Sequence, residues 1–364
     1  MQQIPRLHVG AQLYVSLRGA VVADLPLGEA RPGVAMTPGT LMLWLSAGKP
    51  VSAVAVAQLW ERGLLGLDDP VAAHIPEFAV GGKQAITVRQ ILTHTAGFRA
   101  ALGHWEDKPW DDVIAALCAA RLEPRWMPGE TAGYHPLTSW YVLGELACRL
   151  DGRPFERYIR EAICEPAGMP DAWIGLPPDR YRAYGDRVGL MHDTREGKVE
   201  PNYFIDIERG AAQCRPPSGA RGPAKQLGRF YEMLLNGGAV EGGQRILSPQ
   251  AVEAITSHHR VGLYDKTFRH VVDWGLGFVM QSNRYGVDTV PYGYGKHASR
   301  RTFGHSGSRS SIAYADPTHG LVVACIFNGA PDEAAHDARM RQVNSAIYED
   351  LDLATAGDQG ESGQ

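Results

Sequence analysis

Ser46 and Lys49 are the two residues whose types and spacing point most directly to chemistry. The chain has only seven lysines, and Ser46 is the only serine that lies three residues before one of them. Residues three apart share one face of a helix, so the Lys49 amine can reach the Ser46 hydroxyl. An alcohol is a poor nucleophile unless a nearby base takes its proton. The pair therefore predicts a serine nucleophile activated by a lysine; the alternative is a helix cap beside a solvated lysine.

The segment after this pair favours the catalytic interpretation. Residues 51–60 are apolar at almost every position, which predicts a helix buried on all sides that ends near Gly63. Burial disfavours the charged form of an amine, so Lys49 can act as a base. The start of a helix also offers free N–H groups and a partial positive charge that stabilise an oxyanion. Pro50 is compatible with the first helical turn.

Composition excludes several classes of function. The chain has 364 residues, with 36 Lys plus Arg against 40 Asp plus Glu and a net charge of −4, so neither nucleic acid nor a membrane surface is an expected partner. Five cysteines without zinc-ligand spacing predict reduced thiols and no metal site. No signal peptide is visible, and Lys49 and Pro50 interrupt the apolar stretch 41–60. These features predict a cytoplasmic protein without a cofactor.

Strand patterns lie at the two ends of the chain and helical patterns lie between them. The predicted strands are 8–16 and 20–25, joined by a turn at Arg18-Gly19, and 310–316 and 321–328. The predicted helices, besides 51–60, are a short one after 67–70, 86–93 with Thr87 as its N-cap, 108–121, 137–150, 153–163, 223–236, 248–257 with Ser248-Pro249 at its start, and 332–350. The irregular segment 170–222 either shapes a pocket or only connects elements.

This order predicts an α/β (α+β) fold: one antiparallel sheet built from both termini and flanked by helices, with a mostly helical domain inserted. The sheet domain is expected to comprise residues 1–75 and 260–352. The helical domain with long loops is expected to comprise 76–259, and 353–364 is expected to be a disordered tail.

Four segments of the sequence resemble the serine β-lactamase-like superfamily, which includes class C β-lactamases, D-alanyl-D-alanine carboxypeptidases, esterases and transacylases. They are 40–78 around the nucleophile, ITVRQILTHTAGF at 86–98, the segment 128–169 with a counterpart of the Tyr-x-Asn motif, and the segment 303–328 with a counterpart of the Lys-Thr-Gly motif. The resemblance extends from about residue 8 to residue 350 and implies the superfamily's fold.

The resemblance also implies roles for individual residues. Ser46 matches the acylated nucleophile, Lys49 its base, and Tyr134 the tyrosine that moves a proton between nucleophile and leaving group. Backbone N–H groups of Ser46 and Ser308 would form the oxyanion hole. His305 would be catalytic, and the substrate-binding residues would be His135, Pro136, Ser306 and Gly307. Judged without the resemblance, Tyr134 is more consistent with a buried aromatic residue than with a catalytic one, and His305 with a turn residue.

Two departures from the superfamily pattern bear on the substrate. Pro136 replaces the asparagine of Tyr-x-Asn and therefore offers no side-chain amide. His305 replaces the lysine of Lys-Thr-Gly and is expected to be only fractionally charged at pH 7. Both changes disfavour β-lactam and peptidoglycan substrates. His94 and Thr95, within the matching segment 86–98, are interpreted as structural.

The sequence therefore predicts a serine acyl-transfer enzyme that forms an acyl-Ser46 intermediate from a small-molecule ester or thioester. The acyl group would pass to water, as in an esterase, or to an amine or alcohol, as in the transacylases of antibiotic biosynthesis. One alternative is a β-lactamase or D-alanyl-D-alanine carboxypeptidase. Another is a non-catalytic binding protein that retains the fold. The sequence leaves the oligomeric state open.

Overall fold

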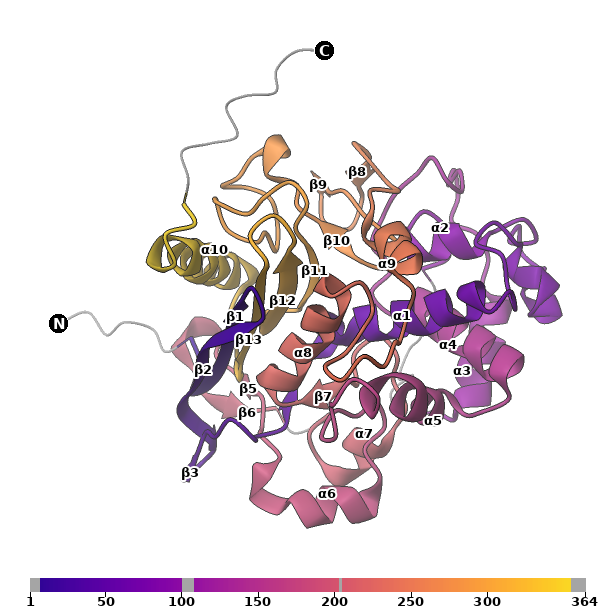
Figure 1. Cartoon of the computed structure of the whole chain (residues 1–364). Helices are drawn as coiled ribbons and strands as arrows, with labels where there is room; N and C mark the ends of the chain where they lie inside the picture. The colour runs from indigo at the N-terminus through magenta and orange to yellow at the C-terminus, as the bar shows by residue number, and fades with distance from the viewer. Residues whose placement is uncertain (1–6, 100–107, 203–204, 355–364) are drawn as a thin grey trace, which may run out of the picture.

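A seven-stranded antiparallel sheet lies toward the left of the molecule in Figure 1, and most of the helices lie to its right. The computed structural model describes residues 7–99, 108–202 and 205–354; the tail predicted at 353–364 lies almost wholly outside them. The strands, in their order across the sheet, are β10 (Val279–Met280), β11 (Phe303–Gly307), β12 (Ser311–Asp316), β13 (Leu321–Phe327), β1 (Gly10–Leu17), β2 (Ala20–Arg31) and β3 (Val34–Ala35). Because β1 pairs with β13, both ends of the chain build one sheet, and the predicted fold class is confirmed.

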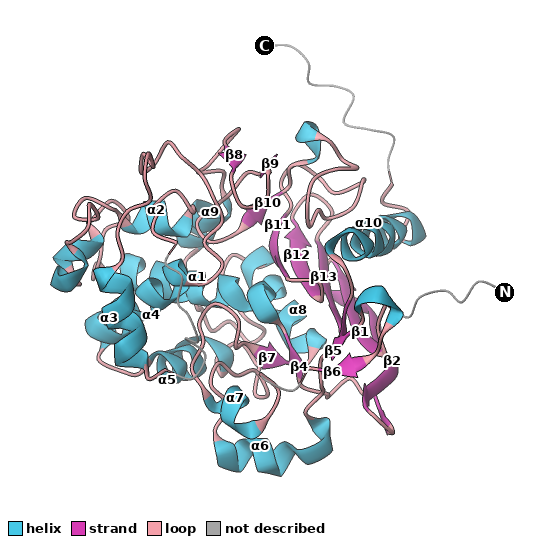
Figure 2. Ribbon diagram, turned by 180° about the vertical axis from the view of Figure 1, so that it is seen from behind, coloured by secondary structure: helices cyan, strands magenta, loops and turns pink. Residues whose placement is uncertain are grey.

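Both faces of the central strands are buried, because a helix covers each face (Figures 1 and 2). Successive side chains of a strand point to opposite faces. In β12 and β13, every second side chain belongs to the large core that includes α8 (Ala224–Leu235). The side chains between them point to the opposite face and pack with α10 (Glu333–Asp350). The unbroken apolar run of β13 follows from this two-sided burial.

Helix α8 belongs with the sheet, although it lies within the segment predicted to form the helical domain. The ring of Tyr14 in β1 crosses α8 at Gly228, where a Cβ atom would overlap it. The Tyr14 hydroxyl then donates a hydrogen bond of 2.7 Å to Glu232 of the same helix. The sequence pattern predicted a helix at 223–236 but did not show which layer it packs against.

Helix α1 (Lys49–Glu61) is buried along almost its whole length, as predicted, and packs against α4 (Thr138–Asp151), α5 (Phe155–Ile159) and α9 (Pro249–Thr256). Thr87 and Ser248 cap their helices through their side-chain oxygens, also as predicted. The segment predicted as a helix at 153–163 is α5 followed by a π-helical turn at Arg160–Cys164. The other helices are α2 (Val88–Leu92), α3 (Trp110–Ala119), α6 (Pro178–Tyr184) and α7 (Glu208–Ala212).

Short strands organise the segments between the helices. Strand β4 pairs with β7, and β5 pairs with both β14 and β6. Strands β8 and β9 form a separate hairpin. Their bounds are β4 (Met42–Leu43), β5 (His192–Asp193), β6 (Glu200–Pro201), β7 (Arg221–Gly222), β8 (Tyr264–Asp265), β9 (His270–Val271) and β14 (Gly329–Ala330). The pair β4–β7 ties the irregular segment 170–222 to the chain just before Ser46.

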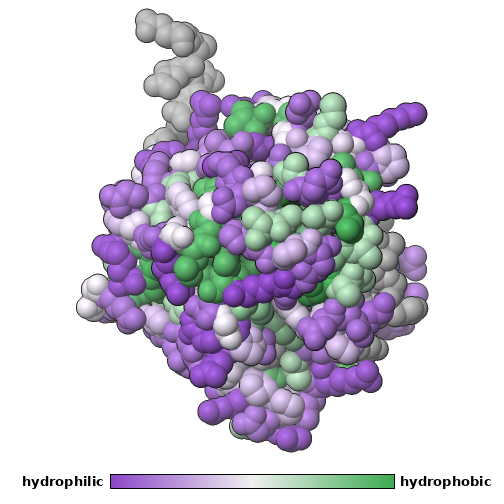
Figure 3. All heavy atoms as spheres, turned by 90° about the vertical axis from the view of Figure 1, so that its right-hand side faces the viewer, coloured by the Kyte–Doolittle hydropathy of each residue, from purple (hydrophilic) through white to green (hydrophobic). Residues whose placement is uncertain are grey.

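Figure 3 shows the side of the molecule that faces right in Figure 1. Polar and apolar residues are mixed over this side. None of the helices in the described parts of the chain combines the length and the apolar composition needed to cross a bilayer.

Candidate active site

Ser46 lies in a single 3-10 turn, Leu45–Gly48, immediately before α1. Leu45 has a φ of 50°, in the left-handed region that costs a non-glycine residue about 1 kcal/mol or more. Its neighbour Trp44 is held from two sides: its carbonyl oxygen accepts a hydrogen bond of 2.6 Å from Ser311 Oγ, and its indole N–H donates to Gly222 O at 2.8 Å. These contacts maintain the strained turn, which leaves Ser46 partly exposed.

Lys49 is fully buried, with its amine beside the Ser46 hydroxyl. The distance between Lys49 Nζ and Ser46 Oγ is 2.6 Å, and Nζ also donates a hydrogen bond to the carbonyl oxygen of Pro217. Burial lowers the pKa of Lys49 well below its usual range. A neutral amine that donates to Pro217 retains a lone pair, which can accept the Ser46 proton. The irregular segment 170–222 therefore shapes the site through Pro217.

Tyr134 lies between two aromatic rings. Trp274 stacks on it with ring centroids 5.7 Å apart, and Phe268 stacks on it at 5.0 Å. Lys49 Nζ is 5.6 Å from the centroid of the Tyr134 ring. Burial raises the pKa of the phenol, an effect that the neighbouring Ser46 hydroxyl partly offsets. Because the buried phenol makes no well-formed hydrogen bond with any described residue, its proton is available for transfer.

A buried carboxylate fixes the backbone of Tyr134. Asp265 Oδ1 accepts a hydrogen bond of 3.0 Å from the Tyr134 N–H, and Asp265 Oδ2 pairs with Arg260 at 2.9 Å. The hydroxyl of Thr267 donates to the Tyr134 carbonyl oxygen at 2.9 Å. Sequence reasoning missed Arg260, Asp265 and Thr267, because nothing in their local pattern indicates contact with a residue more than 100 positions away.

His305 is the third residue of β11 and is neutral. Its Nδ1 is 2.8 Å from the carbonyl oxygen of Ser306, which can only accept, so Nδ1 carries the hydrogen. The lone pair of Nε2 is buried and has no partner among the described residues. Burial lowers the pKa of His305 to about 3. The fractional positive charge expected from the sequence is therefore corrected: burial removes it, and His305 offers an acceptor.

His135, one of the predicted substrate-binding residues, is held from two sides by Gly97 and His94. Its side chain is fully buried, and its Nε2 accepts a hydrogen bond of 3.1 Å from the Gly97 N–H. The backbone N–H of His135 donates a hydrogen bond of 3.2 Å to Nδ1 of His94, and the His94 ring packs edge-on against the Tyr134 ring. His94 thus connects His135 to Tyr134, and a role of His135 in binding substrate remains a prediction.

The other predicted residues lie at the edge of the site. Gly307 ends β11 beside the turn Leu45–Gly48, which is called the nucleophile turn below. A Cβ atom added at Gly307 would be 2.5 Å from the Trp44 carbonyl oxygen and 2.9 Å from Leu45 Cβ. Ser306 is buried, while Pro136, next but one to Tyr134, and Ser308, in the turn after β11, are exposed. Their roles in binding substrate and in the oxyanion hole remain predictions.

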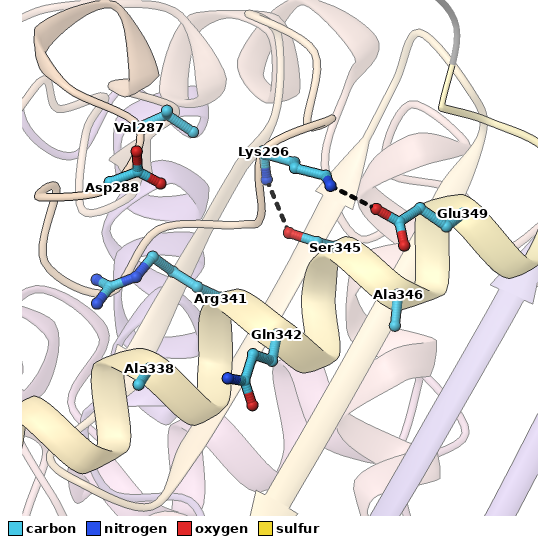
Figure 4. A pocket seen from close by; sticks show the side chains of 9 residues that line it. All are labelled: Val287, Asp288, Lys296, Ala338, Arg341, Gln342, Ser345, Ala346 and Glu349. Carbon is cyan, nitrogen blue, oxygen red and sulfur yellow. Dashed lines mark hydrogen bonds and ion pairs between the residues drawn. The ribbon is translucent and has the colours of Figure 1, made fainter.

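Two hollows in the described parts of the chain lie away from Ser46. One, of about 430 Å³, lies between α10 and the segment 287–296 (Figure 4). Its charged groups are partly engaged: Lys296 Nζ is 2.7 Å from Glu349, and the Lys296 N–H donates to Ser345 Oγ at 3.1 Å. The other, of about 910 Å³, lies beside α8 and the β1–β2 turn. Neither includes a residue of the site described above.

Comparison with known proteins identifies relatives over nearly the whole chain. The family model described as Beta-lactamase matches residues 5–346. Esterase EstB of Burkholderia gladioli is 30% identical, over 89% of this chain and 87% of its own. Esterase/beta-lactamase LipL of Mycobacterium tuberculosis is 27% identical, over 88% of this chain and 77% of its own. A crystal structure of a penicillin-binding protein homologue from Caulobacter crescentus superimposes with a TM-score of 0.78 at 33% identity, over 94% of this chain and 92% of that chain.

Proposed function

This chain belongs to the beta-lactamase family, and we propose that it transfers the acyl group of an uncharged ester or thioester through an acyl-Ser46 intermediate. One observation carries the proposal: the buried, neutral amine of Lys49 lies 2.6 Å from the partly exposed hydroxyl of Ser46. An amine held in this way removes the proton of the attacking alcohol without first having to lose one to water. The relatives described as an esterase and as an esterase/beta-lactamase support ester chemistry.

Acylation of Ser46 follows from the arrangement of these groups. The Ser46 proton moves to Lys49 Nζ as Ser46 Oγ forms a bond to the carbonyl carbon of the donor. The oxyanion that develops is stabilised by the backbone N–H groups of Ser46 and Ser308. The bond from this carbon to the leaving oxygen or sulfur then breaks, and the leaving atom takes the phenol proton of Tyr134. Lys49 Nζ then gives the proton that it received from Ser46 to the Tyr134 oxygen.

Transfer of the acyl group reverses these roles. Water, an alcohol or an amine gives its proton to the Tyr134–Lys49 pair and attacks the acyl carbon. The bond from this carbon to Ser46 Oγ breaks, and Ser46 recovers its proton. The His305 and Tyr134 rings pack with centroids 5.9 Å apart, and neither His305 Nε2 nor the phenol oxygen has a partner among the described residues. We infer that Nε2 accepts a hydrogen bond during the reaction.

The charge state of the site supports an uncharged donor. Lys49 and His305 are neutral, and Arg260 is paired with Asp265. A carboxylate entering this site would lose hydration without gaining a cation from these three residues, which is unfavourable. β-Lactams and peptidoglycan stem peptides carry such a carboxylate. We therefore infer that simple esters are better substrates than β-lactams.

The test is to incubate the protein with p-nitrophenyl acetate and to follow both product release and intact mass. We expect a mass increase of one acetyl group on the wild-type chain. Ser46→Ala should lose the adduct and about 10³-fold or more of kcat/KM. Ser52→Ala, a change on the same helix, is the matched control and should behave as wild type. Adduct formation that persists in Ser46→Ala would refute the proposal, as would turnover of a chromogenic cephalosporin that matches turnover of the ester.

A further inference from the structure

We propose that Phe268 and Tyr292 form the wall that receives the leaving group of the donor and later the acyl acceptor, and that this wall selects flat aromatic groups. The inference rests on the proposed function and adds the chemical class of the group that is bound. The group would bind on the side of Tyr134 on which Phe268 stacks.

Phe268 is held firmly over Tyr134 by the turn of the β8–β9 hairpin. Asp265 Oδ1 accepts hydrogen bonds from the N–H groups of Tyr134 and Phe268, both at 3.0 Å, so one carboxylate oxygen joins the two backbones. The two rings are almost parallel, with an interplanar angle of 16° and centroids 5.0 Å apart. The distance between the rings is therefore set by their backbones and does not depend on side-chain packing alone.

The position of Phe268 defines the open side of Tyr134. Trp274, on the other face of the Tyr134 ring, is fully buried, whereas Phe268 is partly exposed. His94 and His305, both fully buried or nearly so, pack against the Tyr134 ring as well. Among the four described rings that pack against Tyr134, only Phe268 is exposed to solvent in part, and we infer that the group bound next to the phenol lies against it.

Tyr292 extends the aromatic surface outward. Its ring meets Phe268 edge to face, with centroids 5.9 Å apart and an interplanar angle of 67°. Its hydroxyl donates a hydrogen bond to Glu333 in the first turn of α10, which fixes the ring against the body of the protein. Like Phe268, Tyr292 is partly exposed.

The chemistry places the leaving group on this side. Tyr134 gives its proton to the leaving oxygen, so that oxygen must come within about 2.6–3.2 Å of the phenol. The substituent on the oxygen must then extend away from the buried rings, toward Phe268 and Tyr292. The rings of this wall would stack with or meet the edge of a flat aromatic substituent, and such aromatic pairs are stabilising beyond the area they bury.

The test compares two esters that donate the same acetyl group, benzyl acetate and ethyl acetate. In Phe268→Ala, the ratio of kcat/KM for the benzyl ester to that for the ethyl ester should fall about ten-fold relative to wild type, since an aromatic contact is lost. The same ratio should be unchanged in Tyr264→Ala, because Tyr264 lies on the same hairpin and is 57% exposed. The ratio for p-nitrophenyl butyrate against p-nitrophenyl acetate should not change in Phe268→Ala.

Two results would overturn the inference. If both acetates lose activity in Phe268→Ala by the same factor, Phe268 only positions Tyr134. If the butyrate ratio changes instead, the wall binds the acyl group.

A binding arm separates failure of this inference from failure of the proposed function. Benzyl alcohol should bind Ser46→Ala more tightly than it binds the double variant Ser46→Ala/Phe268→Ala, as followed by calorimetry. If the wild-type chain forms no acetyl adduct, the proposed function fails, and equal binding by these two variants would then reject the aromatic wall as well.

Discussion

At the scale of single residues, the feature that makes Lys49 reactive also makes it destabilising. A lysine amine in water is charged at neutral pH, but Lys49 is fully buried and its pKa is lowered. Keeping the amine neutral in the folded state, while the unfolded chain can bind a proton, reduces stability. In the proposed mechanism, the general base is thus obtained at the expense of folding free energy, a trade-off known for active-site groups.

We predict that Lys49→Met abolishes adduct formation and becomes increasingly more stable than wild type as the pH falls. Below the usual lysine pKa of about 10.4, unfolded wild type binds one proton more than the folded form, so its stability falls by up to about 1.4 kcal/mol per pH unit. This continues until the lowered folded pKa is reached. The methionine variant lacks the effect. Urea unfolding between about pH 7 and pH 9 measures the difference.

Lys198→Met is the control for this prediction, because Lys198 is exposed. Its stability should follow the wild-type curve at every pH. If the Lys49→Met and wild-type curves run parallel, Lys49 is charged in the folded protein, and its role as a base is wrong.

At the scale of elements, the site is a junction between the nucleophile turn and strands β11 and β12. Ser311 of β12 bonds to Trp44, and Gly307 of β11 leaves room for Trp44 and Leu45. The sheet therefore holds the strained turn in place from one side, and α1 extends from its other end. A small displacement of β11 should therefore change the position of Ser46 more than that of residues farther from this strand.

We predict that Gly307→Ala reduces kcat/KM by about 10²-fold, since the added methyl group displaces β11 or the turn by part of an ångström. Overpacking of this kind typically lowers the free energy of unfolding by about 1–3 kcal/mol. Ester hydrolysis and urea unfolding measure the two effects.

Gly293→Ala is the matched control, because a Cβ atom there has no neighbour closer than 3.7 Å. It should leave both quantities near their wild-type values. Unchanged kcat/KM in Gly307→Ala would show that β11 does not hold the nucleophile turn.

At the scale of the whole molecule, the helical layer and the sheet are interlocked. The chain enters the sheet at β1, passes through the helical layer and returns to pair β13 with β1. The pairing β4–β7 and the contact between Lys49 and Pro217 cross between segments that are far apart in sequence. Long-range contacts of this kind favour a single cooperative unit.

We predict one unfolding transition for the whole chain. Leu146→Ala, a fully buried change in α4, should lower the free energy of unfolding by about 2–5 kcal/mol. The shift should be equal whether unfolding is followed by helical circular dichroism or by thiol labelling of Cys325, which lies in β13 and is 2% exposed. The labelling uses a variant that keeps Cys325 as its one cysteine.

Separate midpoints for the two probes would show that the helical layer unfolds alone. The sequence-based division into a sheet domain and a helical domain would then describe independent folding units.

The sequence by itself determined the features that depend on neighbours along the chain. The spacing of Ser46 and Lys49, the buried helix after them and the cap at Thr87 are local patterns, and the structure bears them out in its geometry. The strands of both termini followed from alternation and apolar runs, whereas β11 was missed because Phe-Gly-His-Ser-Gly has no such pattern.

Only the tertiary structure decided the electrostatics and the orientation of the site. The neutral state of His305, the inward position of His135, the Asp265–Arg260 pair behind Tyr134 and the contact from Pro217 to Lys49 all join distant segments. Burial sets the charge of a group, and burial depends on which layers pack around it. Local sequence patterns contain neither quantity, so the spacing predicted that Lys49 and Ser46 meet, while only the fold determined the charge of Lys49 and His305 and the groups that surround them.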